Sequence, residues 1–408
     1  MKKILIVLGD YSTGKSPNAI CVSGIIEELE KKYINVDLLS VELDGTLNRK
    51  KSTTKRSVHF VNYPVDGINL IKLNFTKLLA LPLRYPKAVK LLKFELDDLL
   101  KTNKYDAIIA VSHPIETIEA VAGVSRDSFN GKKILYEIDP ASNRYKYPKN
   151  IFEKYWKIKS MKWENKVYNE FDVIIHMVTH KRHYNNEYFK KYDNKTTYLD
   201  IPGLEISNNL TNKVILDNKK INFLYAGAFY PDLRKPDYFI DFFKNINGEI
   251  NFDLNIYTNS MRKHIIRRIS GYEDRIILHN TVPENLLNEY IDSSVDCLIS
   301  IGNFNSDFLP SKVLKNIASL KPVIHFYKDN EDVALNYYKD YPYALLLSEL
   351  DDYNENKVKL KKFLKEINKV NINKESIFKK FVKNTNSFSA NEIYKLVYDD
   401  KENGDYNE

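Results

Sequence analysis

Residues 295–326, VDCLISIGNFNSDFLPSKVLKNIASLKPVIHF, are the most informative stretch of this chain. The apolar run at 297–301 predicts a short buried strand that ends at a glycine and a polar loop. Pro310-Ser311-Lys312 then favours a helix start, because proline suits a first helical position and serine suits a cap. Apolar residues follow at helical spacing, namely Val313, Leu314, Ile317 and Ala318. With a second apolar run at 322–326, the stretch predicts a βαβ unit whose helix begins at the carboxyl end of the first strand.

A helix start in this position is a possible anion site. The free N–H groups and the helix dipole attract phosphates, and Lys312 would add a full positive charge. An ordinary α/β repeat with a solvated lysine accounts for the same pattern equally well.

The run SDFLPSKVLKNIASLKPVI resembles the donor-binding segment of family 4 (group 1) glycosyltransferases of the GT-B fold, in the P-S-K form of relatives that build surface polysaccharides. In that family an acidic residue, a turn and a helix with a second Glu lead into a G-[KT]-P-[VI]-I strand. Asp307 falls at the first acidic position, Lys315 replaces the second, and Leu320 replaces the glycine. The resemblance implies a catalytic role for Asp307. It also implies a donor-binding segment made of Ser306, Phe308, Leu309, Pro310, Ser311 and Lys312.

Composition limits the class of protein. A chain of 408 residues with 43% hydrophobic and 28% charged residues indicates two globular domains. Cys21 and Cys297 lie in apolar periodic segments, which favours a reducing, cytoplasmic compartment without disulfides. The apolar run at 4–8 is too short for a signal peptide, and no run approaches the roughly 20 apolar residues of a membrane span.

The net charge of +8 favours an anionic partner. A nucleotide phosphate or an anionic membrane surface fits this charge, and without a zinc or RNP motif we expect no nucleic-acid partner. The basic region 72–93 is one candidate for peripheral membrane contact at the inner face of the membrane. A helix packed on the N-terminal sheet explains the same region and is favoured.

The first loop of the chain allows two interpretations. After a buried strand at 3–8, residues 9–16 read GDYSTGKS, which matches the Walker A pattern, and residues 134–139, ILYEID, could supply the acidic strand of a P-loop hydrolase. Pro17 argues against that function, because it removes an N–H and biases Ser16 away from αR geometry. In the resembling family this loop faces the donor phosphate, which implies donor contacts for Gly14 and Lys15.

Further apolar strands end in polar residues. His113 and Asp139 each follow such a strand, and in a doubly wound parallel sheet these ends form the ligand-binding edge. The resemblance implies that both are catalytic and lie where the acceptor binds, although a structural capping role accounts for each residue alone equally well. His176, His180 and His183 have metal-like spacing, but His176 falls within a strand, so we expect no metal site. No Asp-x-Asp occurs in the chain, and together with the resemblance this predicts metal-independent catalysis without a cofactor.

A second α/β pattern begins after a polar linker at 203–220. Its first strand leads into GAFYPDLRKP, where the resemblance implies that Arg234 and Lys235 clamp the donor diphosphate; arginine suits this because its planar fork matches phosphate oxygens. Val282 lies in a turn that contacts the base through its backbone in relatives. The expected domains are an acceptor domain at 1–202, the linker, a donor domain at 221–385, and a crossover helix with the tail at 386–408.

The resemblance therefore implies a GT-B fold, with two Rossmann-like doubly wound parallel-sheet domains facing a cleft and a C-terminal helix that crosses back. The expected function is a retaining transfer of a sugar from a nucleotide-sugar donor to a glycan or polyprenyl-linked acceptor, in surface polysaccharide biosynthesis. Two alternatives stay open. One is a P-loop nucleotide hydrolase. The other is a non-catalytic nucleotide-sugar-binding relative, suggested by Lys315 at the second acidic position and by Ala228, which replaces the first basic residue that the family has in the loop at 227–236.

Overall fold

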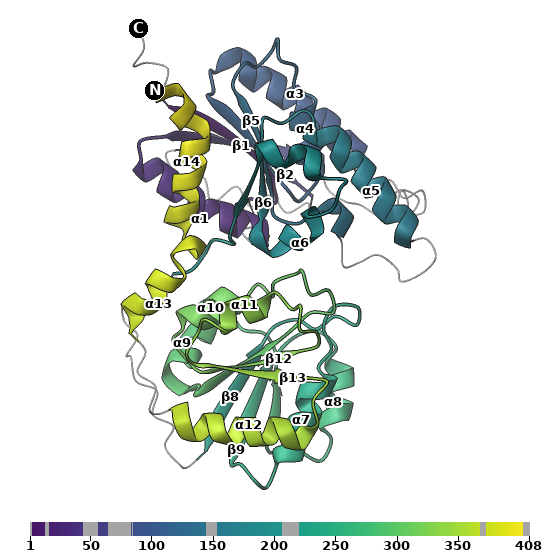
Figure 1. Ribbon diagram of the computed structural model, residues 1–408, viewed down its shortest axis with the longest axis vertical. Coiled ribbons are helices and arrows are strands. Elements are labelled where there is room, and N and C mark those ends of the chain that lie inside the picture. The colour runs from purple at the N-terminus through teal and green to yellow at the C-terminus, as the bar shows by residue number, and fades with distance from the viewer. Residues whose placement is uncertain are drawn as a thin grey trace. The chain divides into compact units, whose positions relative to one another are not determined.

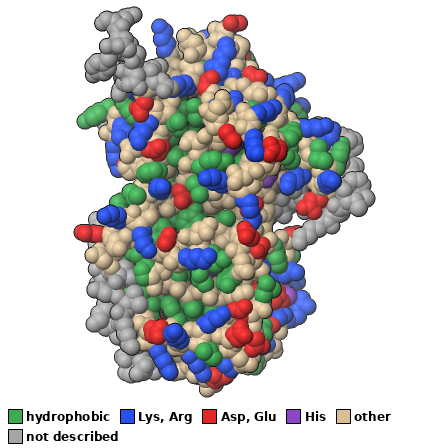
Figure 2. Space-filling model, in the orientation of Figure 1, with side chains coloured by type: hydrophobic (Ala, Val, Ile, Leu, Met, Phe, Trp, Pro, Cys, Tyr) green, Lys and Arg blue, Asp and Glu red, His purple; other side chains and the backbone are tan. Residues whose placement is uncertain are grey.

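The computed structural model describes residues 2–12, 16–43, 56–63, 83, 85–143, 153–205, 220–367 and 373–402. The chain forms two compact units (Figure 1). Unit 1 comprises Met1–Gly203 together with Lys383–Glu408, and unit 2 comprises Leu204–Val382. On the face drawn in Figure 2, basic and acidic side chains are interspersed over both units. Among the described residues, no helix is both long and apolar enough to cross a membrane.

Unit 1 is built on a seven-stranded parallel sheet with the strand order β3-β2-β1-β4-β5-β6-β7. The strands are β1 (Lys3–Gly9), β2 (Asn35–Glu42), β3 (Val58–Asn62), β4 (Ala107–Val111), β5 (Lys132–Glu137), β6 (Val173–Met177) and β7 (Thr196–Leu199). The order reverses between β1 and β4, and such a switch point is where open α/β sheets bind ligands.

Helices cover both faces of this sheet, as an all-parallel sheet requires (Figure 1). On one face, Leu5 and Val7 of β1 join the buried residues of α3 (Pro86–Thr102), α4 (Glu116–Ala122) and α5 (Glu153–Tyr168). On the other face, alternate residues of β1 pack with α1 (Pro17–Lys31) and α14 (Asn386–Glu402). A short helix, α6 (Lys181–Tyr184), follows β6.

The C-terminal helix α14 belongs to unit 1, although all of unit 2 separates it from the rest of that unit in the sequence. Its buried residues Ile393 and Val397 join the core cluster that contains α1. Polar contacts add to the packing, because Tyr398 donates to Asp106 (3.2 Å) and Lys132 donates to the carbonyl of Leu396 (2.9 Å). The predicted return of the C-terminal helix to the first domain is confirmed.

Unit 2 holds a six-stranded parallel sheet with the order β10-β9-β8-β11-β12-β13. Its strands are β8 (Ile221–Ala226), β9 (Phe252–Tyr257), β10 (Ile276–His279), β11 (Cys297–Ile301), β12 (Val323–Tyr327) and β13 (Ala344–Ser348). Its helices are α7 (Asp237–Ile246), α8 (Arg262–Ile269), α9 (Glu284–Ser294), α10 (Val313–Ala318), α11 (Ala334–Tyr338), α12 (Tyr353–Glu366) and α13 (Lys374–Lys380). The order reverses between β8 and β11.

The core of unit 2 is unusually aromatic. Phe243 meets Phe223 and Phe252 edge-on, with ring centroids 5.0 and 5.3 Å apart, and Phe242 meets Phe326 in the same way at 5.3 Å. Such pairs contribute roughly 0.5–1.5 kcal/mol each beyond their area burial. They fasten α7 to the strands on both sides of the switch point, and so fix the edge on which the loops of unit 2 stand.

Both doubly wound parallel sheets predicted from the sequence are confirmed, and the strand at 297–301 has the expected bounds. The expected helix start at Pro310-Ser311 is wrong. Helix α10 begins at Val313 with Lys312 as its N-cap residue, and the Val313 amide donates to the Pro310 carbonyl (3.0 Å) in a turn that precedes the helix. Pro310 lies in this turn and does not occupy the first position of the helix.

Candidate functional site

The switch point of unit 2 brings together the two loops that the sequence predicts to bind the donor. One loop follows β8 and carries Arg234 and Lys235, and the other follows β11 and leads to α10. The two loops are joined directly, because the Phe304 amide donates to the Leu233 carbonyl (2.7 Å). Leu233 and Phe304, 71 positions apart in the sequence, therefore share one carboxyl edge of the sheet.

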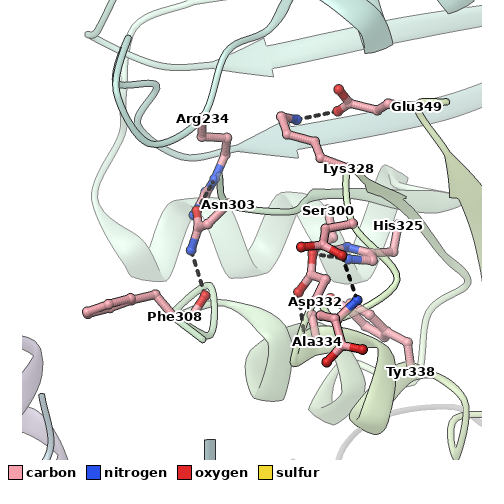
Figure 3. A network of polar contacts seen from close by, with 12 residues as sticks. Arg234, Ser300, Asn303, Phe308, His325, Lys328, Asp332, Ala334, Tyr338 and Glu349 are labelled. Atoms are coloured by element: carbon pink, nitrogen blue, oxygen red, sulfur yellow. Dashed lines mark hydrogen bonds and ion pairs between the residues drawn. The ribbon is translucent and has the colours of Figure 1, made fainter. Parts of the chain in front are cut away.

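Arg234 is held rigidly at this edge. Its backbone pairs with Tyr230, with N···O distances of 2.8 and 3.0 Å in the two directions, which closes a tight loop. Its guanidinium donates from Nε (3.0 Å) and Nη2 (2.7 Å) to the side-chain oxygen of Asn303. The buried Asn303 in turn donates to the Phe308 carbonyl (2.7 Å), so one amide side chain links both loops (Figure 3).

Lys312 adds a second cation. The side chain is half-buried at the start of α10. Burial lowers the pKa of Lys312, and repulsion from Lys315 and Arg234 lowers it further, against an opposing attraction by Glu284. The repulsion between Lys312 and Arg234 indicates positive charge at this edge, which an anionic ligand would offset.

Lys235 and Lys328 flank the ring of Phe304, and sequence reasoning identified neither Phe304 nor Lys328 as part of this site. The ammonium groups of Lys235 and Lys328 lie 5.9 and 5.4 Å from the ring centroid of Phe304, whose side chain is 44% exposed. Lys328 is also paired with Glu349. The only sequence signal for Lys328 was its place after β12, at the same carboxyl edge.

The remaining donor-segment residues have mixed surroundings. Ser306 and Asp307 are buried, Ser311 is exposed, and the Asp307 amide donates to the side-chain oxygen of Asn305 (3.1 Å). Phe308 and Leu309 are half-buried and Pro310 is buried. Val282 lies between β10 and α9 with an exposed side chain. Lys315, which departs from the family pattern, is ion-paired with Glu284 of α9.

Beneath these loops lies a buried polar network that the sequence did not reveal (Figure 3). The ring of His325 on β12 contacts Ser300 Oγ on β11 through Nδ1 (3.0 Å) and Asp332 Oδ2 through Nε2 (3.2 Å). Asp332 also accepts from the Ala334 amide (2.9 Å). The carboxylate lies so close to Gly302 that a Cβ built there would be 2.1 Å from Asp332 Oδ2. The network therefore fixes the point where the loop leaves β11, and it requires glycine at 302.

In unit 1, the structure brings His113 and Asp139 together, at the carboxyl ends of β4 and β5. His113 Nε2 is 3.9 Å from one Asp139 oxygen, and the buried His180 Nε2 is 3.7 Å from the other. Ser112 Oγ accepts from the Ile138 amide (2.7 Å), which fixes the start of this loop. Sequence reasoning assigned no role to His180.

The three histidines with metal-like spacing face different partners. His180 faces Asp139, His183 contacts Ser142 Oγ (2.8 Å), and His176 lies 3.2 Å from Glu137. Within the part of the chain that the structure describes, no group of three or more His, Cys, Asp and Glu side chains is arranged to hold a metal ion.

Glu137 of β5 is fully buried, and its carboxylate accepts from the hydroxyls of Tyr168 and Tyr184. Burial and the adjacent carboxylate raise the pKa values of Tyr168 and Tyr184 well above the ordinary value for tyrosine. Burial lowers the pKa of the neighbouring His176. This cluster explains why a glutamate interrupts the apolar run of β5, and gives it a packing role in the described structure.

The described part of the β1–α1 loop is tied to β2 instead of forming a helix start. Ser12 donates to the buried Glu42 through its amide (3.2 Å) and its hydroxyl (2.6 Å). Ser16 has an extended backbone with ψ of 125°, and α1 begins after it at Pro17, as the effect of proline on Ser16 predicted. Gly14 and Lys15, the predicted donor contacts in this loop, lie outside the described residues.

No protein-family model matches the chain, and no curated protein matches it. Solved structures do resemble it. The apo lipopolysaccharide outer core galactosyltransferase WaaB is similar with a TM-score of 0.62 and 12% identity, over 98% of this chain and 100% of that one. A UDP-GlcNAc 2-epimerase from Methanocaldococcus jannaschii has a TM-score of 0.56 and 10% identity, over 97% and 99% of the two chains. A trehalose-6-phosphate structure from E. coli bound with UDP-2-fluoro glucose has a TM-score of 0.62 and 10% identity, over 97% and 99%. At these identities the likeness shows the fold alone, which is GT-B-like.

Proposed function

We propose that the chain is a glycosyltransferase that moves a sugar from a nucleotide-sugar donor to a glycan or polyprenyl-linked acceptor. The observation that carries this proposal is the positive cluster of Arg234 and Lys312 at the switch point of unit 2. Asn303 holds the Arg234 guanidinium there, and the half-buried Lys312 is close enough for the two charges to repel. Fixed cations at the carboxyl edge of a Rossmann-like sheet suit a nucleoside diphosphate. The fold that the chain shares with nucleotide-sugar enzymes supports the same ligand class.

The chemistry asked of this cluster is to stabilise a leaving group. The bond between the anomeric carbon and the diphosphate oxygen breaks, the acceptor oxygen bonds to that carbon, and the acceptor proton leaves with the diphosphate. Arg234, Lys235 and Lys312 would stabilise the negative charge that develops on the diphosphate. We assign Asp307 to the same reaction, with retention of anomeric configuration and without a metal, as the family resemblance implies.

We assign acceptor binding to the carboxyl edge of unit 1. His113 and Asp139 lie within 3.9 Å of each other there, and the buried His180 contacts the opposite oxygen of Asp139. This arrangement suits the binding and orientation of an acceptor hydroxyl. A lipid-linked acceptor places the reaction in the cytoplasm, at the inner face of the membrane, in surface polysaccharide biosynthesis.

Calorimetric titration with UDP and the other nucleoside diphosphates tests the donor site. Arg234→Ala should weaken binding by about 1.5–3 kcal/mol, the scale of a hydrogen bond to a charged group. Arg267→Ala, which removes an exposed arginine from α8, should leave affinity unchanged. Sugar transfer should persist in EDTA. Unchanged affinity in Arg234→Ala would remove Arg234 from the site, and a strict requirement for Mg²⁺ or Mn²⁺ would contradict the metal-free mechanism.

One observation favours a second candidate function, a nucleotide-sugar-binding protein without catalysis. Lys315 occupies the second acidic position of the resembling family and is ion-paired with Glu284. If the family's second acid is needed for transfer, the chain would bind a donor without turning it over. Donor binding combined with no transfer to any lipid-linked or glycan acceptor would favour this function.

A further inference from the structure

Helix α5, Glu153–Tyr168, is anchored to unit 1 by buried residues that lie between Ser160 and its end at Tyr168. Trp163, Glu164, Val167 and Tyr168 are buried, and the Trp163 indole donates to Glu119 of α4 (2.8 Å). In contrast, no residue from Glu153 through Lys159 is buried. Isolated helices of this length are marginal in water, so the first two turns depend on the anchored half for their stability.

The exposed turns carry large apolar side chains. Tyr155 is 46% and Ile158 is 42% exposed. Successive residues of an α-helix are rotated by about 100°, so Tyr155 and Ile158 fall on one face, roughly opposite the buried Ser160 and Glu164. Tyr155 and Ile158 therefore form a small exposed apolar pair on the part of α5 that has no buried residue.

Lysines surround this apolar pair on the same face. Lys154 and Lys162 lie one turn before and one turn after Ile158, and Lys159 lies one turn after Tyr155 with its ammonium 5.4 Å from the tyrosine ring centroid. All three lysines are exposed. Lys166 continues the face, but its ammonium is paired with Glu119 (3.2 Å). We call Lys154, Tyr155, Ile158, Lys159 and Lys162 the α5 face. At the edge of unit 1 where Figure 1 places α5, Figure 2 shows basic and hydrophobic side chains together with some acidic ones.

We propose that the α5 face binds an anionic lipid bilayer. Lysine ammonium groups reach the headgroup phosphates while the lysine stems, Tyr155 and Ile158 occupy the interfacial region, as in helices that lie on membranes. Charge complementarity identifies the bilayer as anionic, because the face carries three lysines and no acidic residue.

The composition of the face favours lipid over nucleic acid. Helix α5 contains no arginine, the residue best suited to bidentate phosphate recognition, and Ile158 offers no ring on which a base could stack. This surface is separate from the basic region 72–93, most of which lies outside the described residues. The inference concerns where the chain docks and does not depend on its reaction.

Vesicle co-sedimentation tests the proposal, with pure phosphatidylcholine against equal parts of phosphatidylcholine and phosphatidylglycerol. The full chain should bind only the anionic vesicles, and less at high salt. Lys154→Glu with Lys162→Glu should weaken binding at least about tenfold, and Tyr155→Ala with Ile158→Ala at least about threefold. The matched controls lie in unit 2: Lys263→Glu with Arg267→Glu repeats the charge change, and Ile266→Ala with Val358→Ala removes two exposed apolar side chains. Both should bind as the wild type does.

Tryptophan emission locates the contact, because Trp156 and Trp163 are the only tryptophans of the chain and both belong to α5. Because neither lies on the α5 face, the probe is Ile158→Trp in a Trp156→Phe background, and anionic vesicles should shift its emission to the blue. Vesicle binding that neither α5 variant weakens, or that leaves the emission unchanged, would overturn the proposal. No binding to anionic vesicles, or equally tight binding of single-stranded DNA that the same variants abolish, would overturn it as well. Circular dichroism and thermal unfolding of each α5 variant show whether unit 1 remains folded, so that lost binding is not mistaken for lost structure.

Discussion

Lys312 is the residue at which the charge of the proposed donor site can be titrated. Burial, followed by repulsion from Lys315 and Arg234, lowers the pKa of this ammonium. A lowered pKa means that Lys312 loses its proton at a lower pH than an ordinary lysine, whose pKa is about 10.4. The protonated form is the one that attracts phosphate, so nucleotide affinity should decrease as pH rises towards the alkaline range.

Lys312→Arg tests this pH dependence directly. Arginine keeps its charge throughout, so UDP affinity between about pH 7 and pH 10 should be nearly constant in this variant and should decline in the wild type. Calorimetric titration across this range gives both profiles, and Lys263→Arg on α8 serves as a control that should retain the wild-type decline. An equal alkaline decline in Lys312→Arg would assign the titration to another group.

Single residues also show where the sequence stopped being informative. His113 and Asp139 could be predicted because each directly follows an apolar strand, and parallel strands bring their carboxyl ends together. His180 could not be predicted as their neighbour, because it follows a third strand and its approach to Asp139 depends on how the loop after β6 turns back. The sequence predicts no metal site at this histidine, but it gives no sign of the carboxylate partner that packing supplies.

The connection between β11 and α10 depends on a contact that leaves no room for a side chain. A Cβ at Gly302 would lie 2.1 Å from the Asp332 carboxylate, which His325 and the Ala334 amide hold in place. Gly302→Ala should therefore lower the free energy of unfolding by about 1–3 kcal/mol, the cost typical of overpacking. Urea denaturation measures this loss.

Two controls separate the steric effect from a general effect of alanine. Gly123→Ala would meet only the flexible end of Lys93, so its stability should change by less than about 1 kcal/mol. In an Asp332→Ala background, Gly302→Ala should cost much less than in the wild type, because the clashing carboxylate is gone. Additive losses in the double variant would contradict the assigned contact.

The β1–α1 loop decides between sugar transfer and nucleotide hydrolysis. Ser12 is tied to Glu42, Ser16 is extended, and α1 starts only at Pro17. A Walker A loop needs backbone N–H groups at the start of its helix, and proline supplies none. Pro17→Ala should therefore leave sugar transfer nearly intact and should not create ATPase activity, measured by phosphate release in the presence of Mg²⁺. A structure with the ATP β-phosphate ringed by the amides of residues 9–15 would overturn the proposed function.

Strands and helices could be predicted where one regular spacing of apolar residues dominated the sequence. Continuous apolar runs such as 4–8 and 297–301 identified buried parallel strands, because both faces of such strands are covered. The start of α10 was misplaced, since proline suits both a turn and a first helical turn and only the surrounding packing selects one. The network of Ser300, His325 and Asp332 was invisible, because its members come from two strands and a loop.

For the whole molecule, alternating strands and helices were enough to predict two doubly wound sheets, and the family resemblance supplied the return of the last helix. The sequence of 386–402 alone carries little of that information. The role of its buried residues becomes clear only from their packing against α1, where Ala390, Ile393 and Val397 complete the core of unit 1. A helix that follows all of unit 2 is therefore needed to complete unit 1.

This dependence predicts a unit-specific effect on stability. Ile393→Ala should lower the free energy of unfolding of unit 1 by about 2–5 kcal/mol, because Ile393 is only 2% exposed and its removal leaves a cavity against α1. Lys395→Ala, on the solvent side of the same helix, should change it by less than about 0.5 kcal/mol. Hydrogen exchange can resolve the two units: protection should decrease for the amides of β1 and α1, and remain unchanged for those of β8 and β11. An equal loss of protection in both sheets would mean that the two units unfold together, and the assignment of α14 to the stability of unit 1 alone would be wrong.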